Sequence, residues 1–245
     1  MRVGLFVTCL VDVMRPEIGF STVKLLEAAG CEVVVPEQQT CCGQPAYSGG
    51  NRRATRELAE KFLDEFETFD YVVIPSGSCG GMVKTHYDDI LTGYPDLQRR
   101  YASVKARVFE LTDFLYNVVK LEKMPAVAEG SFTGTVTYHD SCCGLRELGV
   151  QAQPRALLAR REGVALHEMN EARTCCGFGG TFAVKYGAIS KAIVDDKCAN
   201  IRASGADAVV LGDLGCMLNI EGRLRRTGDH KTRVLHVAQV LSGDA

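Results

Sequence analysis

The triplet Cys-Cys-Gly occurs three times in the chain, and two of the copies, CCGQP at residues 41–45 and CCGFGGTF at residues 175–182, occupy matching positions in the two halves. A cysteine precedes each of these two triplets, with thirty-one or thirty-two residues between them, and another cysteine follows. The preceding cysteine of the second half, Cys142, belongs to the third triplet, Cys142-Cys143-Gly144. Matching positions are offset by 133 to 137 residues, which indicates a duplicated unit. The first quartet is Cys9, Cys41, Cys42 and Cys79, and the second quartet is Cys142, Cys175, Cys176 and Cys216.

Between these cysteines, apolar stretches that suit strands alternate with longer stretches that suit helices. The first half predicts strand, helix, strand, helix and strand at residues 3–7, 17–29, 32–35, 52–66 and 71–74. The second half repeats that order at residues 135–138, 154–161, 164–167, 182–203 and 208–211. One more strand and helix follow in each half, at residues 108–109 and 112–119 and at residues 234–235 and 237–241.

Strands that alternate with helices form parallel sheets covered by helices. The predicted fold class is therefore α/β, with two tandem, pseudo-symmetric, Rossmann-like βαβ units that each hold one of the two matching CCG triplets. We expect the first unit at residues 1–122, the second at 131–245, and a linker at 123–130. The linker is rich in Pro, Ala and Gly and shows no periodic pattern of apolar residues. Ligands of such sheets bind beyond the carboxyl ends of the strands, where the repeated cysteines fall.

Composition narrows the class of function. A net charge of -2 and a pI near 6.2 give no basic surface for nucleic acid, and no run of eighteen apolar residues predicts a membrane span. The apolar start is interpreted as a first strand and not a signal peptide, so the expected location is the cytoplasm. Eleven cysteines, an odd number without a secretory signal, favour reduced thiolates that bind metal over a disulfide framework.

Four thiolates per half suit a [4Fe–4S] cluster, although structural zinc uses the same donors. Adjacent cysteines reach different irons of a cluster more easily than they chelate one small ion, which favours iron. Glycines beside the cysteines would let the backbone approach and point N–H groups at a cluster, the candidates being Gly43, Gly80, Gly177 and Gly179. Zinc, catalytic or unliganded thiols remain open, and GFGG at 177–180 is only a weak phosphate-loop signal.

The residues Cys9, CCGQP at 41–45, Ser78-Cys79, HDSC at 139–142 and TCCGFGGTF at 174–182 resemble the cysteine-rich CCG domain family. The resemblance runs end to end and is closest to the lactate utilization protein A family. Subunits of heterodisulfide reductase, glycolate oxidase and anaerobic glycerol-3-phosphate dehydrogenase are similar at the CCG motifs.

The resemblance implies a cytosolic system in which this chain, a ferredoxin-like iron–sulfur protein and a third lactate-utilization subunit oxidise L-lactate to pyruvate. This chain would be an oxidoreductase subunit that transfers electrons through two [4Fe–4S] clusters, held by the eight cysteines of the two quartets. The family motif ends in Cys-x-x-Cys, and here Ser76 and Asp213 occupy the first of those positions. Four cysteines therefore remain in each half, with Ser76 or Asp213 as further oxygen donors left open.

Other polar residues have two interpretations each. His139 is the candidate catalytic residue, since it could donate to a sulfide or carry a proton, but an ordinary histidine at a strand end fits equally. Either Cys142 or Cys143 could be the counterpart of Cys9, and the order His-x-x-Cys favours Cys142 and leaves Cys143 as a spare thiol. Cys31 and Cys198 are interpreted as small core residues. Three cations near the cysteines could offset cluster charge or hold a lactate carboxylate, or be solvated, namely Lys84, Arg146 and Lys185.

Three other functions stay open. The first is a thiol–disulfide redox subunit similar to heterodisulfide reductase, in which a cluster cleaves a disulfide. The second is the iron–sulfur subunit of a glycolate or glycerol-3-phosphate oxidoreductase, and the third is a zinc-binding scaffold without redox function. No nicotinamide or flavin fingerprint follows the first strand, so a hydride acceptor has no evident place in this chain.

Overall fold

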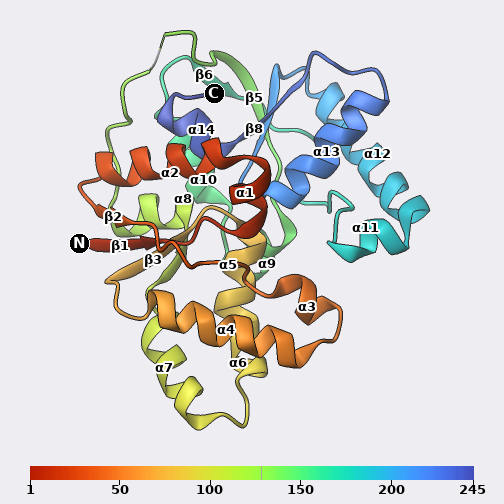
Figure 1. The fold of residues 1–245 in the computed structure, drawn as a ribbon. Coiled ribbons are helices and arrows are strands. Elements are labelled where there is room, and N and C mark those ends of the chain that lie inside the picture. Colours follow the sequence, from red (N-terminus) through yellow and green to blue (C-terminus); the bar gives the residue numbers. More distant parts are fainter. Residues whose placement is uncertain (128) are drawn as a thin grey trace.

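The computed structural model describes residues 1–127 and 129–245 (Figure 1); residue 128, inside the predicted linker 123–130, lies outside the described residues. The elements of the first half alternate between strands and helices, as the pattern of apolar residues predicted. They are β1 (Arg2–Leu5), α1 (Cys9–Met14), α2 (Pro16–Ala28), β2 (Glu32–Val34), α3 (Gln44–Ser48), α4 (Arg52–Phe66), β3 (Tyr71–Ile74), α5 (Gly77–Gly81), the π-helix η1 (Met82–His86), α6 (Tyr87–Ile90), α7 (Pro95–Lys105), β4 (Val108–Glu110), α8 (Leu111–Asp113) and the π-helix η2 (Phe114–Val118).

The second half repeats the same alternation with fewer short helices. Its elements are β5 (Gly134–Tyr138), α9 (Cys142–Leu148), α10 (Ala152–Leu158), β6 (Val164–Leu166), α11 (Thr181–Lys185), α12 (Gly187–Ala203), β7 (Ala208–Leu211), α13 (Leu214–Arg226), β8 (Arg233–His236) and α14 (Val237–Ser242). Across the described ranges, none of the helices has the length and apolar character needed to cross a bilayer.

Each half builds one parallel sheet, and the two sheets have the same strand order. The orders are β2-β1-β3-β4 and β6-β5-β7-β8. Val3 lies opposite Val33 and Tyr71 in the first sheet, and Val136 lies opposite Leu166 and Ala208 in the second. The α/β class and the tandem duplicated units are therefore confirmed. In both sheets the connections leave in opposite directions from the central pair, which makes a switch point at β1/β3 and at β5/β7.

The predicted elements agree with the structure at most positions, with two corrections. The predicted helix 182–203 is wrong as a single helix, because it is interrupted at Tyr186, whose φ of -122° and ψ of 48° are not helical. The poor helix former Gly187 follows at the break. The short helices α1, α5 and α9, which each contain a quartet cysteine, were not predicted, because they are too brief to show a period.

The last helix of each half packs against the other half. Helix α14 lies along α2, and α8 and η2 lie against α10 (Figure 1). A single cluster of buried side chains accordingly joins Leu5, Val11 and Ile18 of the first half to Val136 and Leu157 of the second. Each sheet belongs to one half, but much of the hydrophobic core belongs to both.

Glu110 ends β4 inside this shared region and gives a prediction for pH dependence. Its carboxylate accepts from the backbone N–H of Thr112 at 2.7 Å and of Asp113 at 3.1 Å, and burial raises its pKa to about 7. Above its usual pKa the unfolded chain releases this proton first, so the free energy of unfolding falls as the pH rises toward 7.

Substitution Glu110→Gln should remove this dependence. The stability difference between variant and wild type is expected to change by roughly 2.5 kcal/mol between about pH 5 and about pH 8, in favour of the variant at the higher pH. Urea unfolding at several pH values measures it. Parallel pH profiles for the two proteins would contradict the prediction.

Candidate metal centre

Both cysteine quartets open on one cavity of about 510 Å³. The cavity lies between the two halves, at the carboxyl ends of their central strands. Nine cysteines line it, namely Cys9, Cys41, Cys42, Cys79, Cys142, Cys143, Cys175, Cys176 and Cys216. The structure thus brings together all eight cysteines of the quartets and adds Cys143, which the sequence had suggested was spare.

The fold explains why the cysteines before and after the two matching triplets meet here. Cys9 and Cys142 are the first residues of α1 and α9, directly after the central strands β1 and β5. Cys79 and Cys216 lie in the first turns of α5 and α13, after β3 and β7. Cys9 and Cys79 therefore flank the switch point of the first sheet, and Cys142 and Cys216 flank that of the second. At such a switch point a parallel α/β fold leaves room for a ligand.

The two CCG turns depend on their glycines. Gly43 and Gly177 have φ of 86° and 84°, a left-handed conformation that favours glycine, and a Cβ on Gly177 would lie 2.7 Å from the Ser190 carbonyl oxygen. Their N–H groups donate to Cys41 Sγ at 3.4 Å and to Cys175 Sγ at 3.2 Å. The turns therefore hold Cys41 and Cys175 with their sulfurs against the backbone.

The other two candidate glycines differ in position. Gly179, with φ of 53°, lines the cavity. Gly80 does not line it; a Cβ there would lie 3.0 Å from Leu148 Cδ1 of α9. Its role in the structure is close packing between the halves.

Within each quartet neighbouring thiols shift one another's pKa in series, from Cys9 through Cys41 and Cys42 to Cys79, and from Cys142 through Cys175 and Cys176 to Cys216. Thiols of Cys42 and Cys9 donate to Cys41 and lower its pKa to about 3. Thiols of Cys142 and Cys176 lower the pKa of Cys175 to about 2. Each quartet thus holds one stable thiolate whose neighbours share protons with it.

This arrangement fits a bound metal centre. Metal ligation requires deprotonated sulfurs, and a cation can replace the protons that now lie between them. The buried sulfurs Cys42 and Cys176 have raised pKa values because they donate to Cys41 and Cys175, so they would keep their protons until a metal displaces them. Four convergent sulfurs per half, lining a cavity large enough for more than one ion, suit a cluster.

Ser76 and Asp213 cap helices and join the halves. Ser76 accepts from the N–H of Cys79 at 3.5 Å, and Asp213 accepts from the N–H of Cys216 at 3.3 Å. Asp213 Oδ2 also accepts from Ser78 N–H at 2.7 Å and from Ser76 Oγ at 3.3 Å. Both residues line the cavity, and these hydrogen bonds give them a structural role in addition to the oxygen-donor role suggested by the sequence.

The helices α5 and α9 pack closely beside the cavity because α5 is rich in glycine. A Cβ on Gly77 would lie 2.6 Å from Ser141 Oγ and 3.1 Å from Gly144 Cα, and a Cβ on Gly81 would overlap the Glu147 carboxylate. Helices that carry Cys79 and Cys142 can therefore approach only with glycine at these positions.

Substitution Gly77→Ala should destabilise the protein by roughly 1–3 kcal/mol, because the backbone of α9 cannot move away without opening the cavity. The matched control is Gly222→Ala in α13, where nothing lies within 4 Å of the added carbon and about 0.5–1 kcal/mol of stabilisation is expected. Urea unfolding compares the two. Equal effects of the two substitutions would contradict this account of α5.

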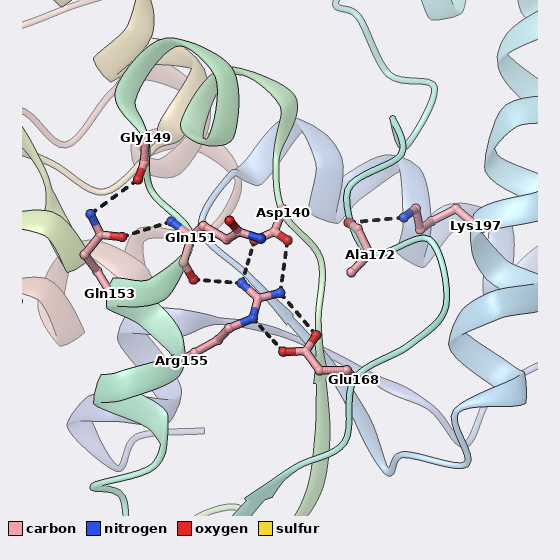
Figure 2. Close-up of polar contacts among 8 residues, drawn as sticks. All are labelled: Asp140, Gly149, Gln151, Gln153, Arg155, Glu168, Ala172 and Lys197. Atoms are coloured by element: carbon pink, nitrogen blue, oxygen red, sulfur yellow. Dashed lines mark hydrogen bonds and ion pairs between the residues drawn. The ribbon is translucent and has the colours of Figure 1, made fainter.

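A buried ion-pair network supports the loop between β5 and Cys142 (Figure 2). The Asp140 carboxylate is buried and accepts from Arg155 Nη1 at 2.7 Å and Nη2 at 3.0 Å. Arg155 also pairs with Glu168, and Lys197 donates to the Ala172 carbonyl on the opposite side of Asp140 (Figure 2). These contacts fix the backbone that carries His139 and Cys142.

The remaining candidates divide between the site and its surroundings. His139 is fully buried behind the second quartet, and burial lowers its pKa to about 3. Cys31 and Cys198 pack in the hydrophobic core. The three candidate cations do not belong to the described lining of the cavity: Lys84 Nζ lies over the Phe109 ring, and Arg146 and Lys185 are exposed.

Sequence reasoning missed Cys143 and Gln44. Gln44 Nε2 of α3 lies 3.9 Å from Cys143 Sγ, so these residues link the two halves across the cavity. The position of Cys143 beside Cys142 is the one signal in the sequence that places Cys143 at the cavity.

The arrangement of paired, cysteine-lined sheets defines a class of protein. The family model of the Cysteine-rich (CCG) domain matches residues 3–84 and 136–221, one copy in each half. Lactate utilization protein A of Halalkalibacterium halodurans is 45% identical over 99% of this chain and 97% of its own length. Lactate utilization protein A of Geobacillus kaustophilus is 46% identical over 99% of both chains. The chain belongs to the lactate utilization protein A family of CCG cysteine-rich proteins.

A solved structure supports the fold alone. A hypothetical protein from Helicobacter pylori superposes with a TM-score of 0.69 at 11% identity, over 100% of this chain and 49% of that one.

Proposed function

We propose that the protein is an iron–sulfur electron-transfer subunit of a cytoplasmic system that oxidises L-lactate to pyruvate. Each quartet would hold one [4Fe–4S] cluster. Its partners would be a ferredoxin-like iron–sulfur protein and a third lactate-utilization subunit, with lactate bound by the assembled system. The observation that carries the proposal is the single cavity lined by both quartets.

The roles of the residues follow from their positions. Oxidation of lactate to pyruvate releases two electrons and two protons, and iron–sulfur clusters accept and pass on electrons one at a time. The eight sulfurs would hold the clusters, and the N–H groups of Gly43 and Gly177 would donate to the ligands Cys41 and Cys175. Since both quartets line one cavity, electrons could pass between the halves without leaving the protein.

The test is the amount of iron, zinc and acid-labile sulfide per chain after anaerobic purification. We expect about eight iron and eight sulfide, and about half of each in Cys41→Ser or Cys175→Ser. The double variant should hold neither. The matched control is Cys31→Ser, which changes a thiol of the hydrophobic core and should leave the metal content unchanged.

The other outcomes separate the alternatives. Zinc without sulfide would contradict the redox function and leave a metal scaffold. If iron and sulfide are present, the oxidised protein is mixed with its two partners and L-lactate, or the reduced protein with its two partners and pyruvate, and the change of visible absorbance as the clusters are reduced or oxidised is followed. Oxidation of the reduced clusters by a disulfide, without any response to lactate and partners, would favour the thiol–disulfide function instead.

A further inference from the structure

The side chain of His139 is directed at the second quartet from behind the cavity. The residue follows β5, where its N–H donates to the Val210 carbonyl of β7 at 2.9 Å. One ring nitrogen of His139 and the sulfurs of Cys176 and Cys216 all lie within 4.8 Å of one another, and all three residues are buried. These are the donor types and spacing of a metal site.

The imidazole has no partner that would explain its burial. His139 is 0% exposed, and neither ring nitrogen makes a hydrogen bond of normal geometry within the described part of the chain. A buried polar group left without a partner is costly, so such groups indicate an interaction with a bound group.

The first quartet has no counterpart of this histidine. His139 stands three residues before Cys142, and Phe6 stands three residues before Cys9. Phe6 is buried among aromatic rings, with ring centroids 5.4 Å from Phe62 and 5.3 Å from Phe66. The duplicated halves therefore present four sulfurs in one case, and four sulfurs and a nitrogen in the other.

We propose that His139 provides a nitrogen ligand to the metal centre of the second quartet and thereby makes the two centres chemically different. The inference rests on the proposed function, since it requires metal on the second quartet. One iron of the second centre would then carry the imidazole in place of a thiolate, and such a replacement raises the reduction potential of an iron–sulfur centre. An electron would then leave the reduced first centre, which is oxidised, and reduce the second, which gives transfer through the chain a direction.

The experiment uses full-length protein reconstituted anaerobically with ferrous iron and sulfide, made with ¹⁵N-labelled histidine, and reduced for pulsed nitrogen hyperfine spectroscopy. We expect the strong coupling of a directly bound nitrogen on one of two centres. His139→Phe, which copies the first half, should lose this coupling and lower one of the two midpoint potentials. The control His236→Asn changes another buried histidine, outside the group formed with Cys176 and Cys216. It should keep the nitrogen coupling and leave the two midpoint potentials unchanged.

The labelled wild type decides the question even if His139→Phe does not fold. Iron and sulfide on both quartets without strong nitrogen coupling, or with only the weak coupling of a hydrogen-bonded ring, would overturn the inference and leave the proposed function intact. Coupling that persists in His139→Phe would also overturn it. A protein that takes up no iron or sulfide would refute the proposed function and this inference together.

Discussion

Substitution Arg155→Ala is expected to lower the free energy of unfolding by about 3–5 kcal/mol, because it leaves the Asp140 carboxylate buried without its partner. The Asp140 side chain is 0% exposed, and Arg155 binds both of its oxygens. Since Asp140 lies between His139 and Cys142, the same substitution should loosen the second quartet. We expect less iron on the second quartet and unchanged iron on the first.

Urea unfolding and iron analysis measure these effects. Arg155→Lys keeps the charge but cannot bind Asp140 and Glu168 with paired N–H groups, so it should fall between alanine and wild type. The matched control is Arg53→Ala, which removes an arginine paired with Glu57 on the exposed face of α4 and should have no measurable effect. A loss in Arg155→Ala no larger than in Arg53→Ala would contradict the role given to this network.

Substitution Asp213→Ala should have the next largest effect, a loss of about 2–4 kcal/mol. It removes the acceptor for the N–H groups of Ser78 and Cys216 and for the Ser76 hydroxyl, all close to the boundary of the two halves. Because one carboxylate positions the helices of Cys79 and Cys216, iron should be lost from both quartets.

The symmetry of the fold supplies the control. Ser76→Ala changes the matching cap in the first half, whose hydroxyl accepts a long 3.5 Å hydrogen bond from Cys79 N–H and donates to Asp213 Oδ2 at 3.3 Å, and about 1 kcal/mol is expected. Asp213→Asn keeps one acceptor oxygen, so its loss of unfolding free energy should lie between those of Asp213→Ala and Ser76→Ala. If Asp213→Ala behaves like Ser76→Ala in urea unfolding and in iron content, the hydrogen bonds that Asp213 accepts from the N–H groups of Ser78 and Cys216 are not important for the site.

Local patterns in the sequence determined the fold of each half. Strands such as β3 and β7 were predicted with their exact bounds, residues 71–74 and 208–211, because buried parallel strands are short apolar runs that need no distant information. The spacing of the cysteines was likewise visible, since strand ends of a duplicated α/β unit recur at fixed intervals. These patterns also selected eight of the nine cysteines that line the cavity.

Only the tertiary structure decided how the two halves combine. The merging of two quartets into one cavity depends on α5 meeting α9, where glycines at 77 and 81 allow close contact, and the period of neither helix shows this. The packing of α14 against α2 and the hydrogen bond between Ser76 and Asp213 join residues more than a hundred positions apart. The burial of His139 against Cys176 and Cys216 arises in the same way. Such contacts depend on how the folded sheets and helices pack against one another. The periodicity of apolar residues along the chain contains no information about that packing.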